Sequence, residues 1–224
     1  MAQYVVEPAT LAPWLPEGLE LDLYAGRCYV SLVAFLFDKT RVKGLRIPFH
    51  SRFEEINLRF YVRRIESDGT QKRGVVFVRE FVPRTAITVI ANTLYEEPYA
   101  TLPTRCSIIS GTHSLSVRYD WRHRGLWQSI AVEALPGARS IAPGSEEEFI
   151  TEHYWGYTKR RDGRTSAYEV RHPRWQVYPI DRYAITADFA ALYGPAFAVL
   201  NQHQPASILL AEGSEVSVQS GVRL

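Results

Sequence analysis

The clearest alternation of apolar and polar side chains lies between Phe53 and Arg64. The even-numbered positions of this stretch are mostly apolar, namely Glu54, Ile56, Leu58, Phe60 and Val62. The odd-numbered positions are polar, namely Glu55, Asn57, Arg59, Tyr61 and Arg63. Because successive side chains of a strand point to opposite faces, this pattern predicts a strand with one face in the core. The other face meets either solvent or a polar interior.

Similar runs predict that most of the chain is sheet. Strands are expected at 27–37, 75–81, 105–109, 115–121, 126–134, 165–170 and 183–189. Asp68-Gly69, Arg124-Gly125 and Asp162-Gly163 are hairpin turns by their residue types. The run 27–37 is apolar on both sides and is therefore predicted to be a central strand. The polar stretch 38–51 is predicted to be a long loop.

Three segments favour helix. Between the strand that ends at Phe81 and a new extended run at Tyr99, an apolar stripe follows helical spacing, with Ile87, Ile90, Ala91 and Leu94. Pro83 is expected in its first turn, and Pro98 ends it. Such a helix, framed by strands, must lie on a sheet or plug a barrel.

Two later segments also favour helix. Ser145 and Glu148 have the spacing of a capping box, which predicts a helix that continues to about Trp155. The segment 190–201 is apolar enough for a helix despite Gly194-Pro195.

Composition narrows the protein class. The 224 residues are 46% apolar, with a net charge of +2 and no apolar run as long as a membrane span. Basic residues form no stripe of the kind that binds nucleic acid. With two cysteines and no signal peptide, we expect a cytoplasmic protein with no membrane or nucleic-acid partner. Residues 1–224 are expected to form one domain.

Four stretches together resemble one known family. Leu94-Tyr95-Glu96-Glu97-Pro98-Tyr99 resembles the Leu-Tyr-x-x-Pro-Tyr signature of DUF2071, the YqjF-like family of the acetoacetate decarboxylase-like superfamily. The stretches that agree with it are 15–22 with Gly26-Arg27, 53–62, and 151–158 with His172-Pro173-Arg174-Trp175. The resemblance implies a β-rich α+β fold, with a mostly antiparallel sheet curled into a barrel and a few covering helices. Family members carry a further short segment before the equivalent of Gln3, so Met1 need not be the natural start.

The resemblance also implies which chemistry is absent. The decarboxylases of this superfamily form a Schiff base through a lysine that follows a proline after the central helix, and this chain has Tyr99 there. The four lysines lie in polar turns or strand flanks, namely Lys39, Lys43, Lys72 and Lys159. A solvated ammonium keeps a pKa near ~10.4 and is a poor nucleophile at neutral pH. We therefore do not expect imine chemistry.

Candidate site residues follow from the polar strand face and the family motifs. Glu55 resembles the active-site carboxylate of the decarboxylases, and Tyr99 is a candidate hydroxyl donor beside it. The further candidates for ligand binding are Asn57, Arg59, Arg84, Tyr157 and His172. The six histidines are isolated from one another, so neither a metal site nor a cofactor is expected.

Three functions remain open from the sequence. The first is an internal pocket for a small anionic or carbonyl-containing molecule. The second is an enzyme of lyase or hydratase type that uses Glu55 and Tyr99 as acid and base. The third is a non-catalytic structural or interaction domain, and a homo-oligomer is compatible with all three.

Overall fold

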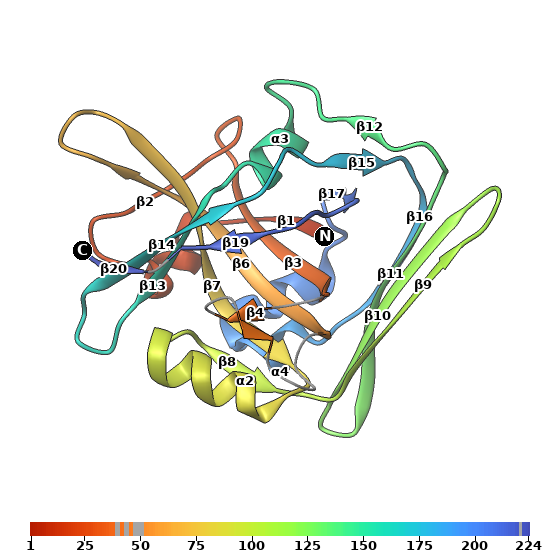
Figure 1. Cartoon of the computed structure of the whole chain (residues 1–224), viewed down its shortest axis with the longest axis horizontal. Helices are drawn as coiled ribbons and strands as arrows, with labels where there is room; N and C mark the ends of the chain where they lie inside the picture. Colours follow the sequence, from red (N-terminus) through yellow and green to blue (C-terminus); the bar gives the residue numbers. More distant parts are fainter. Residues whose placement is uncertain (39–40, 43–44, 47–51, 220) are drawn as a thin grey trace.

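A computed structural model describes residues 1–38, 41–42, 45–46, 52–219 and 221–224. Its strands form one large sheet and several smaller ones (Figure 1). The large sheet comprises β1 (Ala2–Val6), β2 (Glu20–Leu21), β3 (Cys28–Phe37), β6 (Phe53–Ile65), β7 (Gln71–Val82), β8 (Tyr99–Thr101), β13 (Trp155–Lys159), β14 (Thr165–Arg171), β17 (Ser207–Ile208), β19 (Ser217–Val218) and β20 (Val222–Arg223). Its main path is β17-β1-β3-β6-β7-β13-β14-β19.

The second sheet has four antiparallel strands in the order β16-β11-β10-β9. These are β9 (Thr104–Ser110), β10 (Leu115–His123), β11 (Leu126–Ala134) and β16 (Ile180–Thr186). The short strands β12 (Arg139–Ser140), β15 (Gln176–Tyr178) and β18 (Leu210–Ala211) form a third sheet, and β4 (Arg41–Val42) pairs with β5 (Leu45–Arg46). The strands expected from the sequence are all present, with boundaries shifted by a few residues. The stretch 38–51, expected as a loop, falls mostly outside the described residues.

Strand β6 is central, as its pattern predicts. It pairs antiparallel with β3 on one side and with β7 on the other. Leu58 and its even-numbered neighbours are fully buried in the main apolar core. This confirms the predicted core face.

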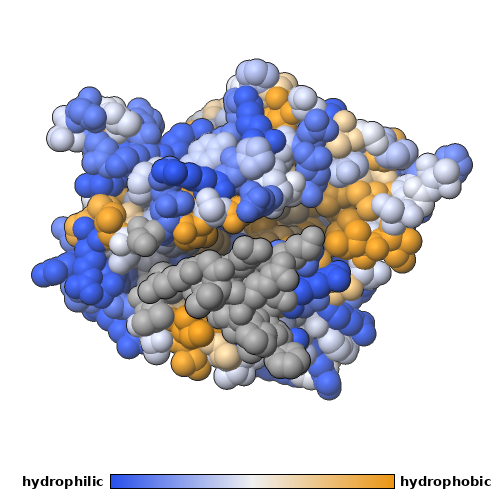
Figure 2. Space-filling view, viewed as in Figure 1, coloured by the Kyte–Doolittle hydropathy of each residue, from blue (hydrophilic) through white to orange (hydrophobic). Residues whose placement is uncertain are grey.

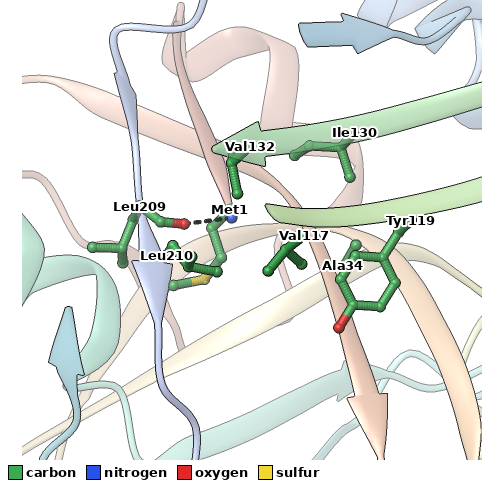
Figure 3. A pocket seen from close by; sticks show the side chains of 8 residues that line it. All are labelled: Met1, Ala34, Val117, Tyr119, Ile130, Val132, Leu209 and Leu210. Carbon is green, nitrogen blue, oxygen red and sulfur yellow. Dashed lines mark hydrogen bonds between the residues drawn. The ribbon is translucent and has the colours of Figure 1, made fainter. Parts of the chain in front are cut away.

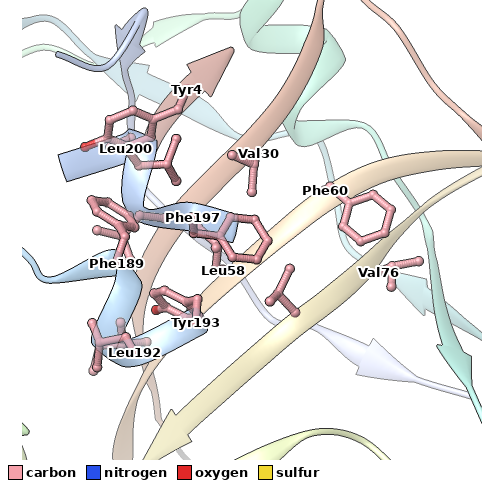
Figure 4. Packing of buried hydrophobic residues seen from close by; sticks show 14 of the residues in the cluster. Tyr4, Val30, Leu58, Phe60, Val76, Phe189, Leu192, Tyr193, Phe197 and Leu200 are labelled. Atoms are coloured by element: carbon pink, nitrogen blue, oxygen red, sulfur yellow. The ribbon is translucent and has the colours of Figure 1, made fainter. Parts of the chain in front are cut away.

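The main core lies between the large sheet, the second sheet and the C-terminal helices. Figure 4 shows the side chains of the C-terminal helices packed against strands of the large sheet. Phe189, Leu192 and Tyr193 of α4 (Phe189–Tyr193) pack there, together with Phe197 and Leu200 of the 3-10 helix η3 (Pro195–Gln202). The helix expected at 190–201 is thus divided in two. The break is at Gly194, whose φ of 105° precedes a proline and takes the backbone out of helical geometry.

Helix α3 (Glu146–Thr151) covers the opposite face of the large sheet. Ser145 caps it by accepting a hydrogen bond from the Glu148 backbone N–H, as the sequence predicts. It ends at Thr151 rather than near Trp155, which instead begins β13. It covers the polar face of β6, because Phe149 packs against Tyr61 there.

The helix between β7 and β8 lies at the edge of the molecule. It consists of α2 (Thr85–Ile90) and one π-helical turn, η2 (Ala91–Tyr95). Pro83 precedes the helix instead of opening it, since the extended Arg84 is its N-cap residue. The predicted apolar stripe is only partly buried, because Ile90 is 40% exposed while Ala91 is buried. The remaining helices, α1 (Pro8–Leu11) and the 3-10 turn η1 (Ala12–Trp14), form the short helical segment near the N-terminus.

The architecture is β-rich with few helices, and its sheets are mixed. Two pairings are parallel, β7 with β8 and β7 with β13, and the other pairings of the large sheet among the described strands are antiparallel. Among the described strands, the ends of the main path do not pair with each other. Closure into a barrel and a single domain over residues 1–224 therefore stay predictions.

Candidate functional site

Three neighbouring strands bring polar side chains together on the face of the large sheet that is opposite the main core. Asn57 of β6 lies in register with Glu80 of β7, and Glu80 lies in register with Tyr99 of β8. Glu55 stands two residues before Asn57 and therefore points to the same face. Glu55, Asn57 and Glu80 are 2%, 0% and 1% exposed. This polar strand face is thus buried and does not meet solvent.

Glu55 is held by two hydrogen bonds. The Tyr99 hydroxyl donates to Glu55 Oε2 over 2.9 Å, and Asn57 Nδ2 donates to Glu55 Oε1 over 2.9 Å. Each carboxylate oxygen therefore accepts a hydrogen bond, and the Glu80 carboxyl is a further hydrogen-bond partner of Glu55. The structure brings together the two residues that the sequence proposed as acid and base.

The π-helical turn η2 positions Tyr99. Asn92 Nδ2 donates to the Tyr99 backbone oxygen over 3.0 Å, and the Tyr99 backbone N–H donates to Asn92 Oδ1 over 2.9 Å. The turn ends at Glu96, a non-glycine residue with a left-handed φ of 55°. Such π-helical turns are rare, and they occur frequently at functional sites.

Tyr168 of β14 lies beside the same cluster. It is opposite Gly156 of β13 in the strand register. A Cβ atom at Gly156 would lie 2.1 Å from Tyr168 Cζ, which is far inside van der Waals contact. Gly156 therefore leaves the space that the Tyr168 ring fills. The Tyr168 hydroxyl is hydrogen-bonded to the carboxyl of Glu97.

Burial raises the pKa of every acid in the cluster. It is the largest cause for Glu55, although hydrogen bonds from Asn57 and Tyr99 act in the opposite direction. Burial and the charges of Glu55 and Glu97 raise the pKa of Glu80 well above its usual value. Burial also raises the pKa of Glu97, to about 7. We define these residues, Glu55, Asn57, Glu80, Glu97, Tyr99 and Tyr168, as the acid cluster.

Arg59 supplies positive charge next to the acid cluster. Its Nη2 lies 3.6 Å from Met1 Sδ and 3.5 Å from the Ile150 backbone oxygen. Its guanidinium carbon is 5.8 Å from the centre of the Tyr61 ring. The Arg59 charge lowers the pKa of Glu55, against the effect of burial. Arg59 therefore places a positive charge on the same face of the sheet.

The family of the chain follows from its sequence profile. Residues 1–215 match the model of DUF2071, described as an uncharacterized conserved protein. The chain belongs to the DUF2071 family. It is also 30% identical over 99 residues to the uncharacterized protein YqjF of Bacillus subtilis (strain 168), a match that spans 44% of this chain and 39% of YqjF.

Solved structures similar to this DUF2071 chain are acetoacetate decarboxylase-like. The acetoacetate decarboxylase of Legionella pneumophila has a TM-score of 0.55 at 10% identity and covers 99% of this chain and 79% of its own. An acetoacetate decarboxylase-like enzyme from Sphingomonas wittichii RW1 has a TM-score of 0.58 at 15% identity, and the match covers 99% of this chain and 86% of that enzyme's chain. The enduracididine biosynthesis enzyme MppR with HEPES bound has a TM-score of 0.61 at 13% identity, and the match covers 100% of this chain and 84% of the MppR chain. At these identities the likeness shows the fold alone.

The two lysines that the structure describes, Lys72 and Lys159, make contacts outside the acid cluster. Lys72 Nζ pairs with Glu66 over 2.8 Å and lies over the Trp155 ring. Lys159 Nζ donates to the Pro13 backbone oxygen. Lys39 and Lys43 lie outside the described residues.

The other candidate binding residues do not join the acid cluster. Arg84 is exposed at the start of α2. The Tyr157 ring is buried in the main core, and its hydroxyl donates to the Lys72 backbone oxygen over 3.2 Å. His172 stacks on Trp175 with ring centres 4.2 Å apart and lines a surface depression of about 460 Å³ with Arg171 and Glu215.

The structure contains a second group of buried polar side chains, which the sequence did not predict. Asp22 Oδ2 accepts hydrogen bonds from Arg73 Nε over 2.6 Å and from His153 Nε2 over 3.1 Å. Burial lowers the pKa of His153 to about 4, so the ring is neutral near pH 7. The Tyr61 ring packs on His153. Both histidine and aspartate occur in family motifs, but only the fold shows that they meet.

The sequence analysis also did not identify three other residues of the acid cluster, namely Glu80, Glu97 and Tyr168. The strand pattern at 75–81 indicated no polar face, and a register shift between Leu58 and Arg59 changes how β7 lies against β6. Glu97 lies inside the Leu-Tyr-x-x-Pro-Tyr motif, which was the one available signal. The pairing of β14 near these strands could not be read from local sequence.

A small apolar cavity lies apart from the acid cluster. It has a volume of about 30 Å³ and lies between the N-terminus, the second sheet and the segment at Leu209 and Leu210 (Figure 3). Figure 2 shows hydrophobic side chains on the side that carries the second sheet, where Ile108, Ile109 and Leu126 are exposed.

Two features are absent from the described part of the chain. Within it, no group of three histidine, cysteine, aspartate or glutamate side chains is arranged to hold a metal ion. No helix in the described ranges is long and apolar enough to cross a membrane.

Proposed function

We propose that this DUF2071 protein binds a small carbonyl-containing or anionic molecule at the acid cluster and catalyses proton transfer on it without an imine. The observation that carries the proposal is the hydrogen bond from Tyr99 to Glu55, formed in a buried site. Acids and hydroxyls with strongly shifted pKa values concentrate at catalytic sites. Catalytic proton transfer is most efficient when such pKa values lie near the working pH.

The roles follow from the chemistry of each group. Arg59 would bind the carboxylate or carbonyl oxygen of the ligand. The ionised form of Glu55 would accept a proton from the carbon next to the carbonyl, and the Tyr99 hydroxyl would hydrogen-bond the enolate oxygen that forms. Glu80, which holds its proton most strongly, would return a proton to the product.

The absence of a lysine at position 99 sets this proposal apart from Schiff-base decarboxylation. The test is incubation with acetoacetate and borohydride, which reduces an imine to a stable adduct. We expect no adduct on any lysine, including Lys39 and Lys43. A stable lysine adduct would contradict the imine-free mechanism.

Proton transfer can be measured directly. One solved structure of MppR is a complex with pyruvate, which makes pyruvate a reasonable first compound. We expect the enzyme to exchange the methyl protons of pyruvate for deuterium, as followed by NMR. Glu55→Gln keeps the shape and removes the base, so exchange should fall by about 100-fold or more.

Glu54→Gln is the matched control, because Glu54 lies next to Glu55 on the opposite face and accepts a hydrogen bond from Thr104. It should leave exchange unchanged. Equal loss in both variants, or no exchange by the native protein with any small oxo acid, would contradict the proposed function.

A second candidate is a non-catalytic domain whose interior is filled by its own side chains. It is favoured by the near-complete burial of Glu55, Asn57 and Glu80 and by the small volume of the apolar cavity. Native mass spectrometry for a co-purified small molecule distinguishes the two, because a ligand lost in Glu55→Gln but retained in Glu54→Gln supports the first candidate.

A further inference from the structure

One end of the second sheet is an apolar edge strand. β9 is the last strand of that sheet and pairs only with β10 among the described strands (Figure 1). Ile108 is 50% exposed and Ile109 is 63% exposed, and the two side chains lie on opposite faces of the strand. A strand edge with free N–H and C=O groups and exposed apolar side chains is a template for pairing with another strand.

The other end of the same sheet is protected by charge. β16 is the last strand there, and it carries the exposed residues Asp181 and Arg182. Arg182 pairs with Glu133, whereas no described residue forms an ion pair with Asp181. The only charged residue of β9 is Arg105, and Asp120 of β10 neutralises it over 3.2 Å. Because charged side chains oppose pairing at an edge, β9 is the end of this sheet that is open to a partner.

The hydrogen bonds to β10 show which backbone groups of β9 are free. The Gly111 N–H donates to the Ser114 oxygen over 2.8 Å, and the Arg122 N–H donates to the Pro103 oxygen over 2.9 Å. At both ends of the ladder, an odd-numbered residue of this segment therefore bonds to β10. Because the direction of these groups alternates along an antiparallel strand, the even-numbered residues point to the open edge. These residues are Thr104, Cys106, Ile108 and Ser110.

We propose that two copies of this chain dimerise through β9, with the two strands antiparallel and a two-fold axis at Ser107. In this register Cys106 lies opposite Ile108 of the second copy, and Thr104 lies opposite Ser110. All four residues have open backbone groups, so each pair exchanges two hydrogen bonds. The seven residues of β9 all pair in this register, whereas a shift by two residues leaves the ends of the strand unpaired. The dimer joins two four-stranded sheets into one continuous sheet.

The side chains favour a second copy as the partner. Cys106 is half-buried against the main core and stands between Tyr119 of β10 and the open edge. Ile108 of the second copy lies beside Cys106 and extends that core by one strand. On the other face, Ile109 lies against the aliphatic part of Arg105 of the second copy. Like charges do not meet, because the two Arg105 residues are four positions apart, roughly 14 Å along the strand.

Sedimentation over a dilution series tests the dimer. A pair of edge strands is smaller than a standard stable interface, so the dimer is reversible and its fraction rises with protein concentration. Ile108→Lys places a charge on the open edge and should weaken dimerisation by at least about tenfold. Leu126→Lys is the matched control, because Leu126 is 73% exposed on β11, which is not an edge strand. It should leave dimerisation unchanged.

A cysteine at position 107 tests the register. The two Ser107 residues form a pair without mutual hydrogen bonds, with Cα atoms about 4.5 Å apart, a distance that a disulfide can bridge. In a Cys106→Ser background, Ser107→Cys should therefore give a disulfide-linked dimer under mild oxidation. Ser110→Cys is the control, since the two Ser110 residues are six positions apart, roughly 20 Å along the strand. It should run as a monomer on a non-reducing gel.

Several results would overturn the inference. One is sedimentation of the native protein as a monomer throughout the series, and another is an unchanged dimer in Ile108→Lys. Species larger than a dimer would mean that β9 pairs with β16 of the next copy, which extends without closing. Absence of the disulfide in Ser107→Cys, or equal cross-linking in Ser110→Cys, would reject the two-fold register. The tests do not involve the acid cluster, so their failure leaves the proposed function standing.

Discussion

Two buried groups of ionisable side chains share one face of the large sheet, and their charges are compensated in opposite ways. In the group around Asp22, one carboxylate receives donors from both Arg73 and His153, and these outweigh burial and lower its pKa. In the acid cluster, Glu80 has carboxyl neighbours and a pKa well above its usual value. The first arrangement favours ionised side chains in an ion pair, whereas the second favours protonated carboxyl groups.

The two faces of β6 give a further contrast. Both are buried, but one is filled by apolar side chains of the main core and the other by the acid cluster and Arg59. Burial on the apolar face stabilises the fold, whereas burial on the polar face has a desolvation cost that its hydrogen bonds only partly offset. Substitutions on the two faces should therefore differ in stability and in pH dependence.

The largest expected effect is on the apolar face. Leu58→Ala should lower the free energy of unfolding by about 2–5 kcal/mol, because it leaves a cavity in the main core. Ile65→Ala, at the 50% exposed end of the same strand, is the control and should cost far less. Urea unfolding of both variants measures the difference. A loss below roughly 1 kcal/mol for Leu58→Ala would mean that this face is not packed.

The group around Asp22 should destabilise the protein in acid. Because the pKa of His153 is about 4 when folded and 6.5 when unfolded, the unfolded chain binds more protons between these values. The free energy of unfolding should therefore fall by about 3 kcal/mol as the pH drops from 6.5 to 4 through this group. His153→Gln should flatten that slope in urea unfolding measured across this range. An unchanged slope would mean that another group, and not His153, causes the pH dependence of the free energy of unfolding.

The acid cluster should have the opposite slope. The pKa of Glu97 is about 7 when folded and 4.5 when unfolded, so the folded chain binds more protons between these values. Its contribution to stability is present below pH 4.5 and is lost as the pH rises through 7, by on the order of 1–3 kcal/mol.

Glu97→Gln should remove this loss, and Glu17→Gln, at an exposed glutamate, should not. If both variants keep the native slope, Glu97 is ionised normally and the contrast between the two groups disappears.

Features set by local sequence patterns could be predicted, whereas features set by tertiary contacts could not. The alternation along β6 is sufficient to predict both faces, because the side chains of a strand alternate by geometry. It cannot show what covers the polar face, since Tyr99 and Tyr168 arrive on strands that are distant in sequence. Glu80 lies on the next strand, but its place beside Asn57 depends on a register shift that no local pattern predicts. Likewise, the apolar stripe of α2 predicts a helix but not its place at the edge of the molecule. Glu55 and Tyr99 were found through the family motifs, and their hydrogen bond needed the fold.

The smallest expected effect on stability is at Tyr99, although it tests the acid cluster most directly. Tyr99→Phe removes one buried hydrogen bond to Glu55 and should lower the free energy of unfolding by about 1 kcal/mol. Since that bond lowers the pKa of Glu55, its loss raises this pKa further, and any exchange activity should shift to higher pH as well as fall. Tyr183→Phe is the control, because its exposed hydroxyl bonds only Gln204 over 3.2 Å within the described residues. A measurement of stability and of the pH profile in both variants separates the two roles of Tyr99, because a merely structural hydroxyl would change the first without moving the second.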